Sequence, residues 1–306
     1  MNYEEFLCYV QESISKRMEP NSKVRMHKVI KNNDIELNGL SIMREEESMS
    51  PTIYLNDYYK SYYEGKDPKD IIDEILDLYD AHKDEIPFDI EAFKSYDQIK
   101  ERIAYKLINY ETNTKLLEDV PYQRILDLAI VFYVVISNDS IGAATVLIRH
   151  EHMDLWNITE NQLYEEAKKN TPLLFKEQLQ DIEDVIREFL SEEYPYKDTS
   201  DDFEDLLDEA SEKTTMYVLT NEERINGAAA ILYDNLLSTF ADEIEQNLYI
   251  LPSSIHEVIL VPATREVTQI ELEKMVLEVN TNEVSEGERL SNHVYFFDRV
   301  QKVLCM

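Results

Sequence analysis

The segment "NLYILPSSIHEVILVPATREVTQIELEKMV", residues 247–276, decides the fold class, because it joins two strand patterns to a helix start. Apolar runs flank the turn Pro252-Ser253-Ser254, which predicts two consecutive strands. Thr268 precedes a helical pattern and Glu271 follows three residues later, the spacing of a capping box. Strands and a capped helix in one segment predict an α+β protein with mixed or antiparallel sheets and packed helices.

The same segment contains Ser253, Ser254 and His256, which are residue types found in hydrolases. A serine nucleophile needs a base within hydrogen-bond reach and a sharp, exposed turn that usually contains glycine. Pro252 precedes the serines and no glycine flanks them. We therefore interpret these residues as turn chemistry between two strands and predict no catalytic residues here.

The first part of the chain predicts a smaller α+β portion, residues 1–103. Apolar residues at helical spacing predict a helix over 3–18. Alternating apolar and polar residues then predict two strands around a turn at 32–34. Asp67 followed by Pro68 is typical of a helix start, because Pro suits the first helical position.

The larger portion, residues 104–306, alternates strand and helix patterns. Apolar runs predict three strands, at 102–112, 124–136 and 142–156. Thr159 and Gln162 then form a capping box, so we expect a strand-strand-helix unit that resembles the one at 247–276. Such similarity would make the two units repeats of each other. A related unit is expected to lead into a helix over 228–245.

Charge is the most unusual property of this chain. Its 306 residues include 30 Lys and Arg against 63 Asp and Glu, a formal net charge of −33. Such a chain repels the phosphates of nucleic acids and of membrane surfaces, so we expect neither to bind directly. It would attract a basic protein or the nucleic-acid-binding surface of another protein. The simpler alternative is that the acids only keep the protein in solution.

Residues 177–212 carry much of this charge, with only Arg187 and Lys197 as basic residues among fifteen acidic ones. The segment still holds apolar residues at helical spacing, so we expect an insert of two acidic amphipathic helices. The apolar positions of the two helices are Leu179, Ile182, Ile186 and Phe189, and then Phe203, Leu206, Leu207 and Ala210. The sequence leaves open whether these helices form an interface or a solvated face.

A candidate metal site is the segment "RHEHMD", where His150, His152 and Asp154 would project to one side of a strand. Three polar residues at a strand end are also common without any metal, and no second Cys or His cluster supports the site. No phosphate-binding loop, dinucleotide-binding motif or paired CxxC motif is present. We therefore predict no cofactor.

The segment "TNEERING", residues 220–227, ends in Asn226-Gly227, which is above all a turn signal. A glycine before an Ala-rich helix start could bind an anion. The acids Glu222 and Glu223 disfavour a phosphate, so we interpret the segment as a structural turn.

Compartment is inferred from cysteine usage and hydropathy. Cys8 and Cys305 are too few for a disulfide framework and suit a reducing cytosol. The opening "MNYEEFLCYV" has no signal-peptide pattern, and the apolar run at 128–136 is shorter than the about 20 residues that cross a bilayer. We expect a cytoplasmic protein without a membrane anchor.

Four blocks of the sequence, "PTIYLNDYY", "VLTNEERINGAAAILYDN", "LPSSIHEVILVP" and "ERLSNHVYFFDR", resemble an uncharacterised family of acidic cytosolic proteins from Gram-positive gut bacteria. The resemblance spans nearly the whole chain. It implies a bacterial cytosolic protein with a domain of unknown function. It implies no activity, cofactor or catalytic residue.

The leading functional hypothesis is a non-enzymatic acidic protein that binds or regulates a partner protein, which would be basic or nucleic-acid-binding. One alternative is an inhibitor that mimics the charge of nucleic acid. Another is a metal-dependent enzyme that uses His150, His152 and Asp154. The sequence does not define the oligomeric state.

Overall fold

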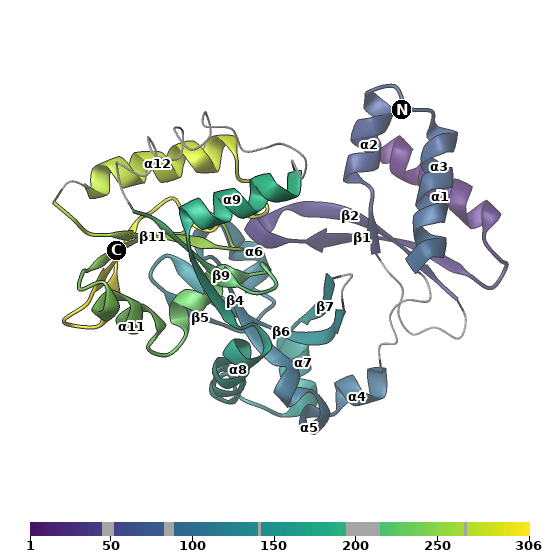
Figure 1. The fold of residues 1–306 in the computed structure, drawn as a ribbon. Coiled ribbons are helices and arrows are strands. Elements are labelled where there is room, and N and C mark those ends of the chain that lie inside the picture. The colour runs from purple at the N-terminus through teal and green to yellow at the C-terminus, as the bar shows by residue number, and fades with distance from the viewer. Residues whose placement is uncertain (45–51, 83–88, 140–141, 194–214, 266–267) are drawn as a thin grey trace. The chain divides into compact units, whose positions relative to one another are not determined.

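The computed structural model describes residues 1–44, 52–82, 89–139, 142–193, 215–265 and 268–306 (Figure 1). The fold is α+β, as predicted, and its sheets are antiparallel. The chain divides into two compact units. The first unit is Met1–Ile99 with Ile136–Ala144, and the second is Lys100–Val135 with Thr145–Met306.

The first unit contains a three-stranded sheet and a group of helices. The strands β1 (Lys23–Ile30), β2 (Glu36–Met43) and β3 (Thr52–Tyr54) pair in that order around the turn η1 (Asn32–Asp34), as the alternating pattern predicts. The helices are α1 (Tyr3–Arg17), α2 (Asn56–Tyr63), α3 (Pro68–His82), α4 (Ile90–Lys94) and α5 (Tyr96–Ile99).

Apolar stripes on α1 and α3 make the core of this first unit. Phe6, Val10 and Ile14 of α1 are fully buried, and Ile71 and Ile75 of α3 belong to the same cluster. The Asp67 carboxylate accepts a hydrogen bond from the Lys69 amide at 2.8 Å, so the helix begins at Pro68 as expected. These contacts confirm the two helices that the sequence predicts, the one over 3–18 and the one that begins after Asp67.

The second unit contains one whole sheet and most of a smaller one. The smaller sheet has β4 (Ile103–Asn109), β6 (Leu128–Asp139) and β5 (Tyr122–Ile125) in that order, with β7 (Gly142–Leu147) also paired to β6. The strands β6 and β7 each have one end within Ile136–Ala144 of the first unit. The larger sheet has the order β13-β12-β10-β11-β9-β8. Its strands are β8 (Glu177–Asp181), β9 (Tyr217–Asn221), β10 (Leu248–Leu251), β11 (Val258–Pro262), β12 (Tyr295–Asp298) and β13 (Val303–Cys305).

The described residues of the segment 247–276 fold as predicted. Strands β10 and β11 pair antiparallel, with Leu248 opposite Pro262 and Leu251 opposite Ile259. Helix α12 (Gln269–Asn282) follows, capped by Thr268 and Glu271. Its Leu272 and Val276 pack with Leu251 and Val261 of the sheet. The capping box that begins α8 (Glu160–Leu174) is likewise confirmed. The duplication of the two units stays a prediction.

Four helix and strand predictions are wrong in this unit. The single strand expected over 124–136 is divided into β5 and β6, because the chain turns at Leu126, whose φ is 52°. The segment from His150 is helix α7 (His150–Trp156), because Met153 and Trp156 are buried at helical spacing and His152 caps the first turn. The single helix expected over 228–245 is broken into η4 (Gly227–Leu232) and α11 (Leu236–Glu243). Asn235 has a φ of 64°, which no continuous helix can include.

The fourth error lies at the start of the acidic segment 177–212, where β8 replaces the expected helix. Leu179 lies opposite Leu219 of β9, so long-range pairing outweighs the local helical spacing. From Ile182 the chain forms α9 (Ile182–Glu193), as the pattern predicts. The second acidic helix, expected over 203–210, lies outside the described residues. The smaller elements are η2 (Lys100–Arg102), η3 (Glu111–Asn113) and α6 (Thr114–Leu117).

In the ranges that the structure describes, no helix is long and apolar enough to cross a bilayer.

A half-buried carboxylate connects the two sheets of the second unit. Asp127, in the tight turn between β5 and β6, accepts a hydrogen bond from the Tyr295 hydroxyl at 2.5 Å and from the Ser291 hydroxyl at 2.6 Å. Nearby, the Asn109 side chain donates to the Leu290 carbonyl at 3.0 Å. Burial, together with the negative charge of Asp127, raises the pKa of Tyr295, so this hydroxyl remains a donor.

Replacement Tyr295→Phe tests this connection. The variant keeps the ring but removes a donor from a charged acceptor, so we expect the free energy of unfolding to fall by roughly 1.5–3 kcal/mol. Urea denaturation measures it. Tyr249→Phe is the matched control on β10, since the Tyr249 hydroxyl forms no hydrogen bond with described residues and its ring also packs on the sheet. Equal losses in the two variants would contradict the role of Asp127.

Candidate functional site

A pocket of about 520 Å³ opens in the second unit between β8, the end of α8 and the start of α11. This volume lies within the range of about 300–1,000 Å³ that is typical of ligand sites. Glu177 and Leu179 of β8 line it, because alternate residues of a strand point to the same face. The sequence offered no sign of this pocket, since β8 was expected to be helical.

The floor of the pocket is apolar. Leu179, Leu236 and Phe240 line it together with the rings of Pro172 and Tyr233. Phe240 is almost fully buried and meets Tyr217 of β9 edge to face, with ring centroids 4.8 Å apart. The floor is therefore fixed by packing against the large sheet.

The break between η4 and α11 shapes the pocket wall. The Tyr233 hydroxyl donates a hydrogen bond to the Phe175 carbonyl at 2.7 Å, which ties the end of η4 to the segment between α8 and β8. Asn235 then adopts its left-handed conformation and turns the chain into α11. This turn places Leu236, Thr239 and Phe240 along one side of the pocket.

The charges at the rim are all negative. Glu177, Asp234 and Glu243 line the pocket, and its lining includes no Lys or Arg. Asp234 pairs with Lys168 at 2.9 Å, and the hydrogen bond and charge of Asp234 raise the pKa of Lys168. The carboxylates of Glu177 and Glu243 form no ion pair or hydrogen bond with described residues. The pocket thus combines an apolar floor with two unneutralised acids.

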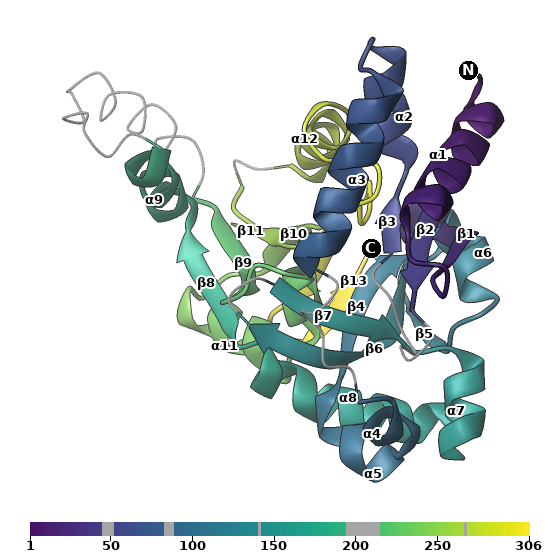
Figure 2. The ribbon, with the colours of Figure 1, turned by 90° about the vertical axis from the view of Figure 1, so that its right-hand side faces the viewer.

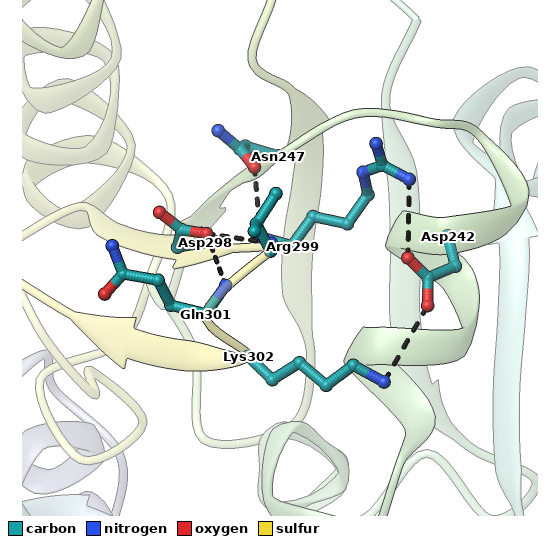
Figure 3. Close-up of polar contacts among 7 residues, drawn as sticks. Asp242, Asn247, Asp298, Arg299, Gln301 and Lys302 are labelled. Carbon is teal, nitrogen blue, oxygen red and sulfur yellow. Dashed lines mark hydrogen bonds and ion pairs between the residues drawn. The ribbon is translucent and has the colours of Figure 1, made fainter.

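A cluster on the far end of α11 holds this helix against the sheet edge. Asp242 of α11 faces Arg299 at 3.5 Å and Lys302 at 3.9 Å, as Figure 3 shows. The Asp298 carboxylate accepts the amides of Val300 and Gln301, each at 2.8 Å, which closes the turn between β12 and β13.

These ion pairs of Asp242 are partly exposed, and such pairs contribute at most about 1 kcal/mol. The Arg299 amide also donates to the Asn247 side chain at 3.0 Å (Figure 3). The cluster therefore links α11 to the turn between β12 and β13 but adds little to stability.

The serine and histidine candidates form the turn that the sequence predicts. The His256 amide donates to the Ser254 hydroxyl at 3.0 Å, and His256 Nδ1 accepts from the Asn226 amide at 3.3 Å. The His256 ring therefore faces a backbone amide and not a serine hydroxyl. The strand-turn-strand interpretation of Ser253, Ser254 and His256 is confirmed.

The segment 220–227 packs tightly against this turn. The Thr220 hydroxyl donates to the His256 carbonyl at 2.8 Å. A Cβ at Gly227 would lie 2.2 Å from the Thr220 hydroxyl oxygen and 2.4 Å from the His256 carbonyl oxygen. Only glycine fits at such a close approach. Asn226 has a φ of 53°, so the predicted turn at Asn226-Gly227 is confirmed.

Glu223, in the same turn, has an unusual environment. One of its carboxylate oxygens is buried and forms no hydrogen bond with described residues. Its charge, together with burial, contributes to the raised pKa of both Tyr133 and Tyr233. An acidic residue inside a turn gives no sequence signal of this kind, because its surroundings come from distant strands.

The metal candidates lie on α7 and not on a strand. His150 and Asp154 are four residues apart and share a helix face, but His152 caps the helix, since its Nδ1 accepts from the Arg149 amide at 3.1 Å. The His152 ring also packs on Trp156, with centroids 5.7 Å apart. Within the described ranges, no group of three or more His, Cys, Asp or Glu side chains is arranged to hold a metal.

The fold and the pocket together define an α+β protein with antiparallel sheets and an acid-rimmed apolar cavity. A model for a family of unknown function, DUF5688, matches residues 3–299, so the chain belongs to this family. The resemblance to an uncharacterised family is thereby confirmed over nearly the whole chain. No curated protein matches the chain. No solved structure matches it either.

Zinc or manganese should leave the melting temperature unchanged, because His152 is already engaged in capping α7. A metal that bound only the folded state would raise the melting temperature with concentration. Thermal denaturation with and without each metal, after purification without chelator, measures this. A rise that is lost in the variant His150→Ala/Asp154→Ala would contradict the expectation and support a metal site on α7.

His152 should also make stability depend on pH. Burial lowers the pKa of His152, Arg149 lowers it further, and Glu151 opposes both. The folded-state pKa is then below the unfolded value of about 6.5, so the unfolded state takes up the proton first as pH falls. Stability is therefore lost on acidification below about pH 6.5.

The variant His152→Gln should lose less unfolding free energy between pH 7 and pH 5 than the wild type. Urea denaturation at several pH values measures the difference. His150→Gln is the control, because its ring makes none of the contacts of His152. The same pH dependence in all three proteins would contradict this role for His152.

Proposed function

We propose that this protein is a non-enzymatic acidic protein that binds, and thereby regulates, a basic partner protein. The net charge of −33 carries the proposal. A surface with so large a surplus of carboxylates attracts cationic partners and speeds their association. The acid-rimmed pocket beside β8 supports the same chemistry, because Glu177 and Glu243 have no cation of their own among the described residues.

We also propose that this binding occurs in the cytoplasm of a bacterium. Cys8 and Cys305 are both free and exposed, which suits a reducing compartment. Direct binding to nucleic acid or to an anionic membrane is disfavoured, because both would repel the chain. A nucleic-acid-binding protein as the partner is the narrower form of the same proposal.

A tagged pull-down from a native lysate of the source organism tests the proposal, read by mass spectrometry at about 50 mM and about 500 mM NaCl. Screening shortens to a few ångströms at high salt, so a basic partner should be retained at low salt and lost at high salt. An unrelated bait of similar negative charge is the control, since any polyanion collects some basic proteins.

The captured partner is then purified and its affinity measured directly. An affinity that falls with salt and exceeds the affinity for the control bait supports the proposal. Competition by duplex DNA would favour a nucleic-acid-binding partner. A partner that survives high salt, or no partner beyond those of the control bait, would contradict an acidic binding protein.

A further inference from the structure

The outer edge of β8 is open among the described residues. β8 is the last strand of the large sheet and pairs only with β9 there (Figure 2). At one end of the pairing, the Glu222 amide donates a hydrogen bond to the Lys176 carbonyl at 2.9 Å. At the other end, the Ile182 amide donates to the Met216 carbonyl at 3.0 Å. Antiparallel hydrogen bonds alternate along a strand, so Gln178 and Gln180 bond to β9.

The same alternation turns the backbone amides and carbonyls of Glu177, Leu179 and Asp181 away from β9. These groups form a row along the open edge that can pair with another extended chain. Such pairing is a common mode of peptide recognition, in which main-chain hydrogen bonds supply affinity and side-chain pockets supply specificity.

The pocket lies beside this edge. The side chains of Glu177 and Leu179 line the pocket, and the backbone groups of the same residues face outward. A strand added to β8 would therefore place every second side chain on the pocket face of the sheet. The open edge and the pocket form one continuous site for an extended peptide.

The chemistry of the pocket selects the side chain that enters it. Leu179, Leu236 and Phe240 suit an apolar stem, while Glu177 and Glu243 suit a positive end group. Lys and Arg have this combination, because their methylene chains pack on apolar surface while the charge stays at the rim. The rings of Tyr233 and Phe240 also favour a cation.

A second copy of this chain does not fit the site. Glu177 and Asp181 on β8 would repel another β8 edge, and the two chains would each carry a net charge of −33. Acidic residues on an edge strand commonly prevent self-pairing in this way. The occupant is therefore a chain of opposite charge.

We propose that the open edge of β8 accepts an extended basic segment of a partner protein as an additional strand, with a Lys or Arg side chain in the adjacent pocket. This inference rests on the proposed function and specifies the site and the form of the partner. Backbone pairing sets the direction and register of the bound segment, and the carboxylates of Glu177 and Glu243 select a positively charged one.

The test uses a capped nine-residue peptide in which Arg alternates with Val, labelled for fluorescence anisotropy. Leu179→Pro removes an outward amide of β8 but leaves the bonds of Gln178 and Gln180 to β9, and proline is tolerated where an edge amide faces outward. We expect affinity to fall at least about tenfold, because one hydrogen bond is lost, the ring obstructs pairing and the Leu179 side chain no longer lines the pocket.

A second arm leaves the protein unchanged. Methylating alternate backbone nitrogens of the peptide blocks strand pairing but keeps all charges, so the methylated peptide should also bind about tenfold more weakly. This arm keeps the proposal falsifiable if Leu179→Pro does not fold, which circular dichroism and the melting temperature reveal. Equal binding of the methylated and unmethylated peptides would overturn the strand addition.

The third arm tests charge at the pocket. Glu177→Lys/Glu243→Lys should weaken binding at least about tenfold. The control Glu278→Lys/Glu283→Lys makes the same change in net charge at an exposed position of α12 and at its exposed C-cap, and it should weaken binding far less. Equal effects of the two double variants, or equal binding of a peptide with Gln in place of Arg, would overturn the pocket assignment.

The outcomes also separate this inference from the proposed function. One result is peptide binding that is salt-sensitive and yet unchanged by Leu179→Pro, by backbone methylation and by the pocket charge variants. That result would reject the β8 site, while the proposal of an acidic binding protein would still hold. No basic partner at low salt in the pull-down would reject the proposed function itself.

Discussion

The carboxylate of Asp127 joins the two sheets of the larger unit. It lies in a tight turn, where Leu126 has a φ of 52°, and accepts hydroxyl hydrogen bonds from Ser291 and Tyr295. Two charge-assisted bonds join the small sheet to the chain that enters β12. Because β12 lies between β13 and β10, its position fixes the side of the large sheet that is farther from β8. The order β13-β12-β10-β11-β9-β8 extends outward from there to the open edge.

The pocket follows from a second constraint, the close approach at Gly227. The chain passes so near Thr220 and His256 that no side chain fits, and η4 begins there with five consecutive buried residues, from Gly227 to Ile231. The Tyr233 hydroxyl bonds to the Phe175 carbonyl just after η4 ends, and the left-handed Asn235 interrupts the helix. Had the helix continued to residue 245, α11 would not turn beside β8. The cavity therefore exists because tertiary contacts interrupt a local preference.

This interruption explains which parts of the structure the sequence could predict. Local signals sufficed for the segment 247–276, where a turn and the Thr268 capping box each act within a few residues. They failed where distant partners decide, as at β8, whose apolar spacing fits a helix but whose Leu179 pairs with Leu219. They also failed at His152, whose ring caps α7 by accepting a hydrogen bond from the Arg149 amide. The pocket joins residues 172–179 to 233–243, so no local pattern could reveal it.

The acidic residues beside the β8 edge affect the proposed binding in a specific way. Carboxylates at an open rim stay hydrated, so their attraction for a cation is screened and adds mainly to association rate and selectivity. Affinity must then come from the backbone groups of β8 and from the apolar floor around Phe240, which have little charge preference. Either feature alone would bind weakly or indiscriminately. Together, in the proposed site, they would discriminate between strands, since Glu177 and Asp181 would repel a second copy of the chain and attract a basic one.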